Sequence, residues 1–508
     1  MPSEAIRLGP FVGGLNLLSD PTALQDTELV QALNVELDLD GSYIARPPFF
    51  DLASPGSGSS IRLLGYYITD AHTRLMACTS TGIWAYESGA WSSVSGTTSP
   101  AIKATCMVQY DNICYIIATP DSAADGGSIN DTLTFSSIAA LPRGGSAVVL
   151  KERLFVAPGP LKTGSDASLL KGSAAASFST FPIAVYINKG DGQKLIDVKV
   201  YNDNLLLFKE DSTYVFAYDS DPADAVVRRV NPTIGCADIN CVVPYENQLY
   251  VLHRNNVYEV VNYDFAKLNS KVPFYYDSTK PSPWLTPLFL STLGDRLIAR
   301  YYAKLYVFGL KTKIWTEWET ASNSRYIGPA VAVPIRNEAG AVPSYIMPSA
   351  EASNNDIHCF RDIIDGVNTE SISIRIKTKN YDYGIPQRYK RLMWWGCDVS
   401  CVQAITGTVQ PITVNFSVTW GQISTYTWGQ VSGNTWGQPL NVPFIVQSSA
   451  PAHSAMRKFV KFPKTTRFRQ VNYQVDMSYN GTNVQGPLRF FAMTTLIGSK
   501  QTVSKQLT

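Results

Sequence analysis

The sequence has few of the side chains that enzymes use for acid–base chemistry. Only four of its 508 residues are histidine, and charged residues make up 17% of the chain, against about 25% in an average globular protein. It contains no GxSxG, HExxH or Walker motif and no dinucleotide-binding glycine fingerprint. Because glycosidases can carry their carboxylates in β folds without a motif, a glycosidase stays open as a minor alternative. Together these absences favour a structural or binding protein, and we expect no catalytic residues and no cofactor.

The eight cysteines are not spaced as metal ligands. Cys236 and Cys241 lie close in sequence, as do Cys397 and Cys401, but no CxxC pair occurs, and histidines are far from both pairs. We therefore expect no metal site. Free buried thiols in a chain made in a reducing cytoplasm are the simplest interpretation.

Long apolar runs are missing as well. No stretch of 18 apolar residues occurs, so we expect no membrane span. The opening "MPSEAIRLGPF" lacks the basic head and apolar stretch of a signal peptide, so we expect no secretory signal.

The middle of the chain carries a loose repeat typical of β-strands. A turn residue, then Leu or Ile, then a strand recurs at intervals of 38 to 51 residues. The anchors are Leu75, Ile113, Leu154, Leu205, Leu249 and Leu297. Short strands at a period of about 40–50 residues indicate a β-propeller, whose blades must stack to bury their faces. We expect an all-β chain with a propeller of six or seven blades over residues 56–365, a weaker seventh unit lying within 325–360. An array of ordinary β-sandwiches is the alternative.

The first 55 residues indicate an extended arm that docks on, or completes, another part of the protein. A short helix is expected near Asp26–Asn34, with Asp26 as its cap and Glu28 facing solvent. The alternating "VELDLDGSYIARPPF" around Asp40-Gly41 predicts a hairpin.

Residues 366–508 change rhythm and predict a separate antiparallel β-sandwich platform. Strict alternation over Ser371–Lys377 predicts a half-buried strand with Arg375, Lys377 and Lys379 on one face.

The segment "TWGQISTYTWGQVSGNTWGQ" repeats four residues at a spacing of eight, so Trp420, Trp428 and Trp436 are evenly spaced. Glycines in the repeat interrupt extended strands, so we favour a short meander whose tryptophans cover the sandwich. Exposed aromatic contacts to sugars or a partner are the alternative, since Trp stacks well on flat apolar faces.

Charge is distributed unevenly although the net charge is only +2. Residues 1–60 carry two basic and eight acidic side chains, a net of −6, whereas residues 361–508 carry 16 basic and six acidic, a net of +10. Such asymmetry indicates either an interface between unlike surfaces, contact with a polyanion, or simply solvated surfaces.

Two stretches resemble tail proteins of tailed bacteriophages. "FVGGLNLLSDPTALQDTELVQALNVELDLDGSYIARPPF" is similar to the opening of the tail nozzle (tail tubular protein B) of short-tailed phages. "IRIKTKNYDYGIPQRYKRLMWW" is similar to a strand pair near the C-terminus of such proteins, with Tyr383 where Phe is common and Tyr389 before Lys390-Arg391. The resemblance covers about 40 residues at the front and about 130 at the back, counting "FPKTTRFRQVNYQVDMSYNG".

The resemblance implies a virion protein made in the host cytoplasm, with a propeller and a sandwich platform, forming a homo-oligomeric ring, expected to be a hexamer. Its partners would be tail adaptor or tube proteins, fibres or spikes, and genomic DNA passing without sequence-specific binding. The residues expected at subunit or adaptor interfaces are Asp20, Asp26, Glu28, Glu36, Arg46, Arg375, Lys377, Lys379, Arg388, Lys390 and Arg391. A DNA conduit must not retain its duplex through many phosphate contacts, so we expect the basic residues to face protein. The alternative functions are a receptor-binding tail or fibre protein that recognises host glycans, and a propeller glycosidase.

Overall fold

The computed structural model describes most of the propeller region and the strands of the C-terminal region. The described residues are 3–47, 49–52, 55–56, 61–96, 102–236, 238–254, 256–268, 271–272, 289–301, 304–319, 331–333, 344–348, 357–361, 371–381, 390–400, 412–421, 440–446, 456–461, 467–468, 470–480 and 489–499.

The chain divides into two compact units. The sandwich unit comprises Met1–Pro48, Tyr306–Ala321 and Ile363–Thr508, and the propeller unit comprises Phe49–Leu305 and Ser322–Asp362. The predicted boundaries, after residues 55 and 365, lie close to the two outer divisions at 48 and 362. The structure differs in assigning 306–321, which the sequence placed in the propeller, to the sandwich unit. The N-terminal segment is therefore part of the sandwich unit.

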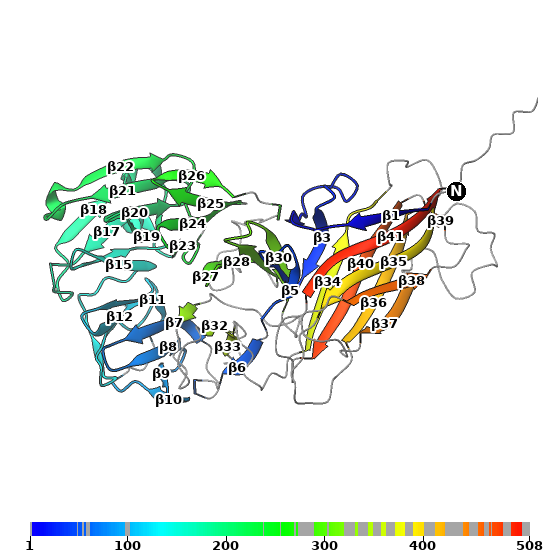
Figure 1. Ribbon diagram of the computed structural model, residues 1–508. Helices are drawn as coiled ribbons and strands as arrows, with labels where there is room; N and C mark the ends of the chain where they lie inside the picture. Colours follow the sequence, from blue (N-terminus) through cyan, green and yellow to red (C-terminus); the bar gives the residue numbers. More distant parts are fainter. Residues whose placement is uncertain are drawn as a thin grey trace, which may run out of the picture. The chain divides into compact units, whose positions relative to one another are not determined.

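Four-stranded antiparallel sheets repeat through the propeller unit, as the sequence predicts (Figure 1). In chain order the first five are formed by β7 (Ile61–Ile68), β8 (Thr73–Thr79), β9 (Ile83–Glu87) and β10 (Ala90–Ser93); β11 (Ala104–Tyr110), β12 (Ile113–Ala118), β13 (Gly127–Ile129) and β14 (Phe135–Ser137); β15 (Ser146–Leu150), β16 (Arg153–Ala157), β17 (Leu169–Gly172) and β18 (Ile183–Tyr186); β19 (Leu195–Tyr201), β20 (Asn204–Lys209), β21 (Thr213–Ala217) and β22 (Val226–Asn231); β23 (Val242–Tyr245), β24 (Gln248–His253), β25 (Asn256–Val261) and β26 (Asp264–Lys267). Figure 1 shows them following one another along an arc, with the first strand of each sheet innermost.

Among the described residues, two further groups of strands follow. The antiparallel pair β27 (Phe289–Leu293) and β28 (Arg296–Tyr301) continues the series. The last sheet has the order β31 (Val331–Val333), β32 (Ser344–Pro348), β33 (Ile357–Arg361), β6 (Phe49–Leu52). Its outer strand, β6, comes from the N-terminal end of the unit, so the first and last repeats in sequence are joined in space, as ring closure requires.

The six anchor residues all lie in the second strand of a repeat: β8, β12, β16, β20, β24 and β28. Five of them are buried, and Ile113 is half-buried. Several preceding turns have two residues with positive φ, among them Asp111-Asn112, Lys151-Glu152 and Asn202-Asp203. That conformation gives the two-residue hairpin turn whose twist matches the flanking strands. Apolar side chains of adjacent blades form shared clusters, such as the one that joins Tyr67 and Met76 of the first blade to Ile116 and Phe135 of the second.

The sandwich unit holds two sheets. One has the order β38 (Met456–Lys461), β35 (Lys390–Ser400), β41 (Arg489–Ser499), β5 (Tyr43–Ala45), β4 (Val35–Leu37), with β1 (Ser3–Leu8) beside β41 and β39 (Arg467–Phe468) beside β35. In the other, β30 (Trp315–Trp318), β3 (Glu28–Leu33), β34 (Ser371–Thr378), β40 (Gln470–Asn480), β36 (Ile412–Gly421) and β37 (Leu440–Val446) lie in this order, with β2 (Gly14–Leu15) beside β3. Strand β29 (Lys304–Gly309) contains the division between the units at residues 305 and 306. The N-terminal segment thus contributes strands to both sheets.

The helix expected near Asp26–Asn34 is wrong, because Glu28–Leu33 forms strand β3. The first two and last two residues of β3 are buried and the middle two are half-buried, and Leu29 and Leu33 both lie in the core. Strand β3 has neighbours on both sides, parallel to β30 and antiparallel to β34, and this pairing outweighs local helix propensity. The hairpin predicted around Gly41 is confirmed, with Val35 opposite Ala45 and Leu37 opposite Tyr43.

The helical segments among the described residues are three short 3-10 turns, η1 (Gly164–Ser168), η2 (Lys189–Asp191) and η3 (Pro222–Asp224). Within the same residues no helix has the length and apolar character needed to cross a membrane.

Candidate functional site

The first candidate site lies in the sandwich unit, where β3 and β34 pair antiparallel. Leu29 is opposite Thr378, Gln31 opposite Lys377, and Leu33 opposite Arg375. The strand alternation predicted for 371–377 is confirmed, because Ile372, Ile374, Ile376 and Thr378 are buried whereas the residues between them are exposed or half-buried. The acidic N-terminal segment and the basic C-terminal strand are therefore direct neighbours within one chain.

Lys379 joins these two segments through three contacts. Its Nζ donates to the Leu24 carbonyl oxygen at 2.9 Å, forms an ion pair with Asp26 Oδ1 at 2.6 Å and lies 5.4 Å from the centre of the Tyr381 ring. Asp26 is 80% exposed, so water screens the ion pair and its net contribution is about 0–1 kcal/mol. The ammonium mainly fixes the loop before β3 against β34.

Arg46 is buried and acts as a second connection. Its Nε donates to Asn34 Oδ1 at 2.9 Å, and its Nη atoms donate to the carbonyl oxygens of Pro47 at 2.9 Å and Glu319 at 3.0 Å. Asn34 has a left-handed φ of 56° and also donates from Nδ2 to the Ser373 carbonyl at 2.7 Å. The central role of Asn34 has no local sequence signal, because two of its partners, the Glu319 amide and the Ser373 carbonyl, lie about 290 and 340 positions away in sequence.

Three further predicted interface residues lie in the N-terminal segment. Glu28, expected in solvent, is buried and accepts hydrogen bonds from Asn16 Nδ2 and the Gln25 amide. Asp20 is exposed, and its hydrogen bonds from the hydroxyl and amide of Thr22 hold its pKa below the usual value. Glu36 is half-buried in β4.

The remaining predicted residues are not gathered into one described site. Arg375 is exposed and Lys377 half-buried on β34. Lys390 and Arg391 open β35, opposite Ser499 and Gly498 of β41. Trp420 lies in β36, opposite Val471. Arg388, Trp428 and Trp436 lie outside the described residues, as does the meander expected for the repeat.

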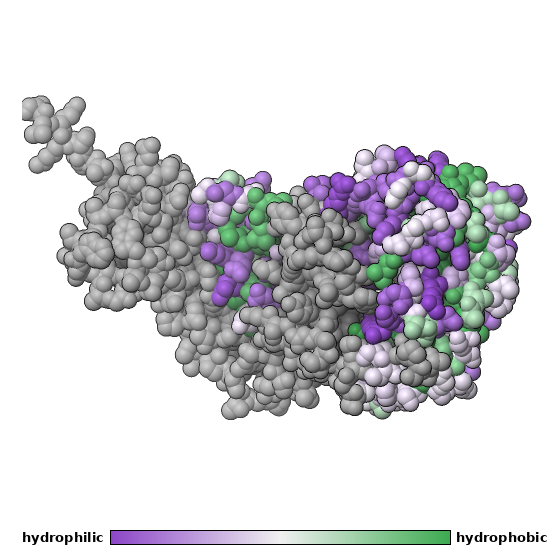
Figure 2. Space-filling view, turned by 180° about the vertical axis from the view of Figure 1, so that it is seen from behind, coloured by the Kyte–Doolittle hydropathy of each residue, from purple (hydrophilic) through white to green (hydrophobic). Residues whose placement is uncertain are grey.

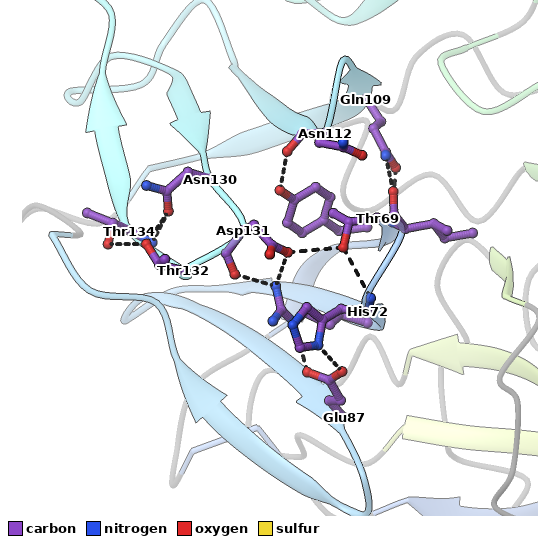
Figure 3. Close-up of polar contacts among 12 residues, drawn as sticks. Thr69, His72, Glu87, Gln109, Asn112, Asn130, Asp131, Thr132 and Thr134 are labelled. Carbon is purple, nitrogen blue, oxygen red and sulfur yellow. Dashed lines mark hydrogen bonds and ion pairs between the residues drawn. The ribbon is translucent and has the colours of Figure 1, made fainter.

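The second candidate site is a polar cluster between the first two blades of the propeller unit (Figure 3). Arg74 of β8 is almost fully buried and donates from Nε to Glu87 Oε2 at 2.8 Å, within its own blade. From Nη1 it donates to the Asp131 carbonyl at 2.7 Å and to Asp131 Oδ1 at 3.3 Å, in the neighbouring blade. Thr69 Oγ1 donates to the same Oδ1 at 3.0 Å. One buried cation thus joins two blades.

Glu87 is the shared acceptor of this cluster, since His72 Nδ1 lies 2.6 Å from its other oxygen (Figure 3). Burial disfavours the charged form of Glu87, but the hydrogen bonds from Arg74 and His72 outweigh it and hold the pKa of that carboxyl below its usual value. Tyr67 and Gln109 add hydrogen bonds across the same blade boundary, to the backbone of Asn112 and Ile68 respectively.

A third group of polar side chains surrounds Asp197 in the fourth blade and includes the partly exposed Lys199. Asp197 of β19 is fully buried, and its Oδ1 accepts from Ser146 Oγ and from the Val198 amide at 2.7 Å, with Lys199 Nζ at 3.1 Å. Burial is the largest single influence and lowers the pKa of Lys199, but the charge of Asp197, its hydrogen bond and the nearby Cys106 together outweigh burial, so the pKa is raised. Among the described residues no group of three or more His, Cys, Asp or Glu side chains is arranged to hold a metal ion.

No protein-family model and no curated protein matches the chain. Solved structures with similar backbones include the extracellular domain of a one-component-system protein, BT4673, from B. thetaiotaomicron, at 9% identity and a TM-score of 0.44, covering 63% of this chain and 40% of that one. The Pan2 WD40 domain of Neurospora crassa has 9% identity and a TM-score of 0.41 over 64% of this chain and 98% of that one. YCF48 bound to D1 peptide has 6% identity and a TM-score of 0.40 over 62% and 95%. The chain thus spans less than half the length of the BT4673 structure, and all three likenesses are distant.

Proposed function

We propose that this chain is a non-enzymatic structural protein of a bacteriophage tail. In this proposal several copies, six by the resemblance, form a ring around the path of the DNA and join other tail parts.

The observation that carries the proposal is the pairing of β3 with β34. Strand β3 lies in the first stretch that resembles tail-nozzle proteins and most of β34 lies in the second, and the two strands are neighbours in one sheet although they are more than 330 positions apart in sequence. Asn34 and Arg46, both within the first stretch, are bonded into the same unit. If the whole platform resembled that of tail-nozzle proteins, the two similar segments would be expected to pack against each other, as they do here.

The charged groups described above support a mechanical rather than a catalytic role. The side chains of Arg46, Arg74 and Lys379 donate hydrogen bonds to backbone carbonyls or to carboxylates of neighbouring strands and blades. Such bonds hold strands and blades in register against load. In the proposed ring, the exposed Arg375 face of β34 would contact a neighbouring subunit or an adaptor protein rather than DNA.

DNA passage sets a limit on the lining of such a ring. Each phosphate neutralised by a lysine or arginine adds to affinity and to its salt dependence, so a basic lining would retain the duplex. We therefore expect weak, sequence-independent DNA binding that is lost at moderate salt.

Single-particle electron microscopy of the purified chain tests the proposal. A closed ring with a central hole of about 20–40 Å, wide enough for a duplex about 20 Å across, is the expected result. A monomer, or a compact trimer without a hole, would count against the tail ring and in favour of a receptor-binding protein.

A further inference from the structure

The fourth blade ends in an outer strand that is unusual for this propeller. Strand β22 has six residues, "VVRRVN", whereas the outer strands β10, β14, β18 and β26 have three or four. Short or charged edge strands normally prevent pairing with another chain. Because β22 is long, it lacks the protection that a short edge strand gives.

The side chains of β22 are exposed on both faces. Val226 is 64% and Val227 38% exposed, and all four residues from Val226 to Arg229 are exposed. On one side the strand pairs with β21, with Val226 opposite Ala217 and Arg228 opposite Val215. On the other side it is the end of its sheet, and Figure 1 shows it at the outer margin of the unit. Figure 2 shows hydrophobic residues beside hydrophilic ones on that margin.

Charge along β22 has a direction. Asp219, Asp221 and Asp224 precede the strand, the two valines begin it, and Arg228 and Arg229 follow. Arg229 leans on Tyr214, with its Nε donating to the hydroxyl at 3.0 Å, and no described residue forms an ion pair with Arg228. Opposite charges across paired strands stabilise the pair, and like charges destabilise it. An incoming strand is therefore favoured if its apolar residues face the valines and its acidic residues face the arginines.

We propose that β22 is a docking edge for an extended, acidic–apolar segment of a partner protein, which adds as a fifth strand to the fourth blade. Backbone hydrogen bonds to the edge supply affinity, and the two arginines supply selectivity and register. A second copy of β22 is a poor occupant, because antiparallel pairing of two such strands brings four arginines together. The proposal does not depend on the tail ring.

The probe is a fluorescein-labelled, end-capped peptide Thr-Val-Glu-Glu-Val-Val, which matches β22 antiparallel, compared with Thr-Val-Lys-Lys-Val-Val. Fluorescence anisotropy with the full chain at low salt measures binding, and hydrogen exchange of the backbone locates it. We expect the glutamate peptide to bind at least about fivefold more tightly than the lysine peptide and to protect amides of 226–231, since one opposite-charge pair gives up to about 1 kcal/mol.

The matched variants are Arg228→Glu on β22 and Lys267→Glu on the outer strand β26. Arg228→Glu should weaken the glutamate peptide about fivefold or more and strengthen the lysine peptide, while Lys267→Glu should change neither. Equal binding of the two peptides, unchanged binding to the Arg228→Glu variant, or protection at another strand would overturn the proposal. Dimerisation of the chain through β22, detected as concentration-dependent protection without peptide, would overturn it too.

Discussion

The buried arginine between the first two blades permits a quantitative test of the propeller. Replacing Arg74 by alanine removes donors to Glu87 at 2.8 Å, to the Asp131 carbonyl at 2.7 Å and to Asp131 Oδ1 at 3.3 Å. Hydrogen bonds to charged groups contribute about 1.5–3 kcal/mol each. The two carboxylates are 33% and 46% exposed, so water recovers part of that energy, and we expect a loss of about 3 kcal/mol.

For a unit of this size the loss corresponds to a fall of about 5 °C in the propeller melting temperature. Differential scanning calorimetry at pH 7 measures it. The control is Lys103→Ala, in which a surface lysine loses a 2.7 Å ion pair to Asp121 between partners that are 40% and 53% exposed. We expect the control to cost less than about 1 kcal/mol.

The same variant has a predictable pH dependence. Because the folded-state pKa of Glu87 lies below its ordinary value, its stabilising contribution is present above about pH 4.3 and is lost as pH falls through the folded pKa. Arg74→Ala removes much of the cause of that shift, so the stability difference between native chain and variant should shrink below about pH 4. A difference under about 0.5 kcal/mol at pH 7, or one independent of pH, would refute the role assigned to Arg74.

Three further predictions concern single residues of the propeller unit. In urea unfolding, Gly235→Ala should destabilise the chain by about 2 kcal/mol or more, because a Cβ there would collide with the Lys209 carbonyl oxygen and lie 2.7 Å from the Asp211 nitrogen. A Cβ at Gly190 meets nothing within 4 Å, so Gly190→Ala should be neutral. Equal effects of the two substitutions would contradict this account. Asp197→Asn should cost about 2 kcal/mol, because it leaves the Lys199 ammonium, whose side chain is only 24% exposed, beside a neutral group. Chemical denaturation at pH 7 checks this, and unchanged stability would show that the ion pair is dispensable. Thiol labelling followed by mass spectrometry should modify half-buried Cys106 before buried Cys78, Cys114, Cys236 and Cys241, because the reagent reaches a half-buried sulfur more readily. Faster labelling of any of the four buried thiols would oppose the blade packing described.

The repeat of the propeller could be predicted because its signal is local. Each anchor is among the first three residues of the second strand of a blade, and five of the six follow a two-residue connection, so turn and strand are specified within about ten residues. Arg74 and Glu87 also lie within one hairpin, on strands with Leu75 opposite Tyr86, so their contact is implied once the hairpin is accepted. The contact of Arg74 with Asp131 in the next blade is not implied by that hairpin.

Features that depend on distant pairing could not be predicted in the same way. "ELVQAL" is compatible with helix or strand, and β30 and β34, which decide for strand, lie about 290 and 340 positions away. The position of β6 beside β33 and the bonds of Asn34 likewise bring together segments with no shared sequence signal. Asp26 and Lys379 were both expected at interfaces with another subunit or an adaptor, and the structure shows that these two residues form an ion pair within one chain.

The most direct measurement of the central proposal is electron microscopy of tail fractions of the virion in which the proposal places this chain. The account predicts density for the propeller and sandwich units, repeated around the DNA path at the end of the tail. Density for this chain in a peripheral fibre, or its absence from the particle, would contradict the proposed role as a tail ring.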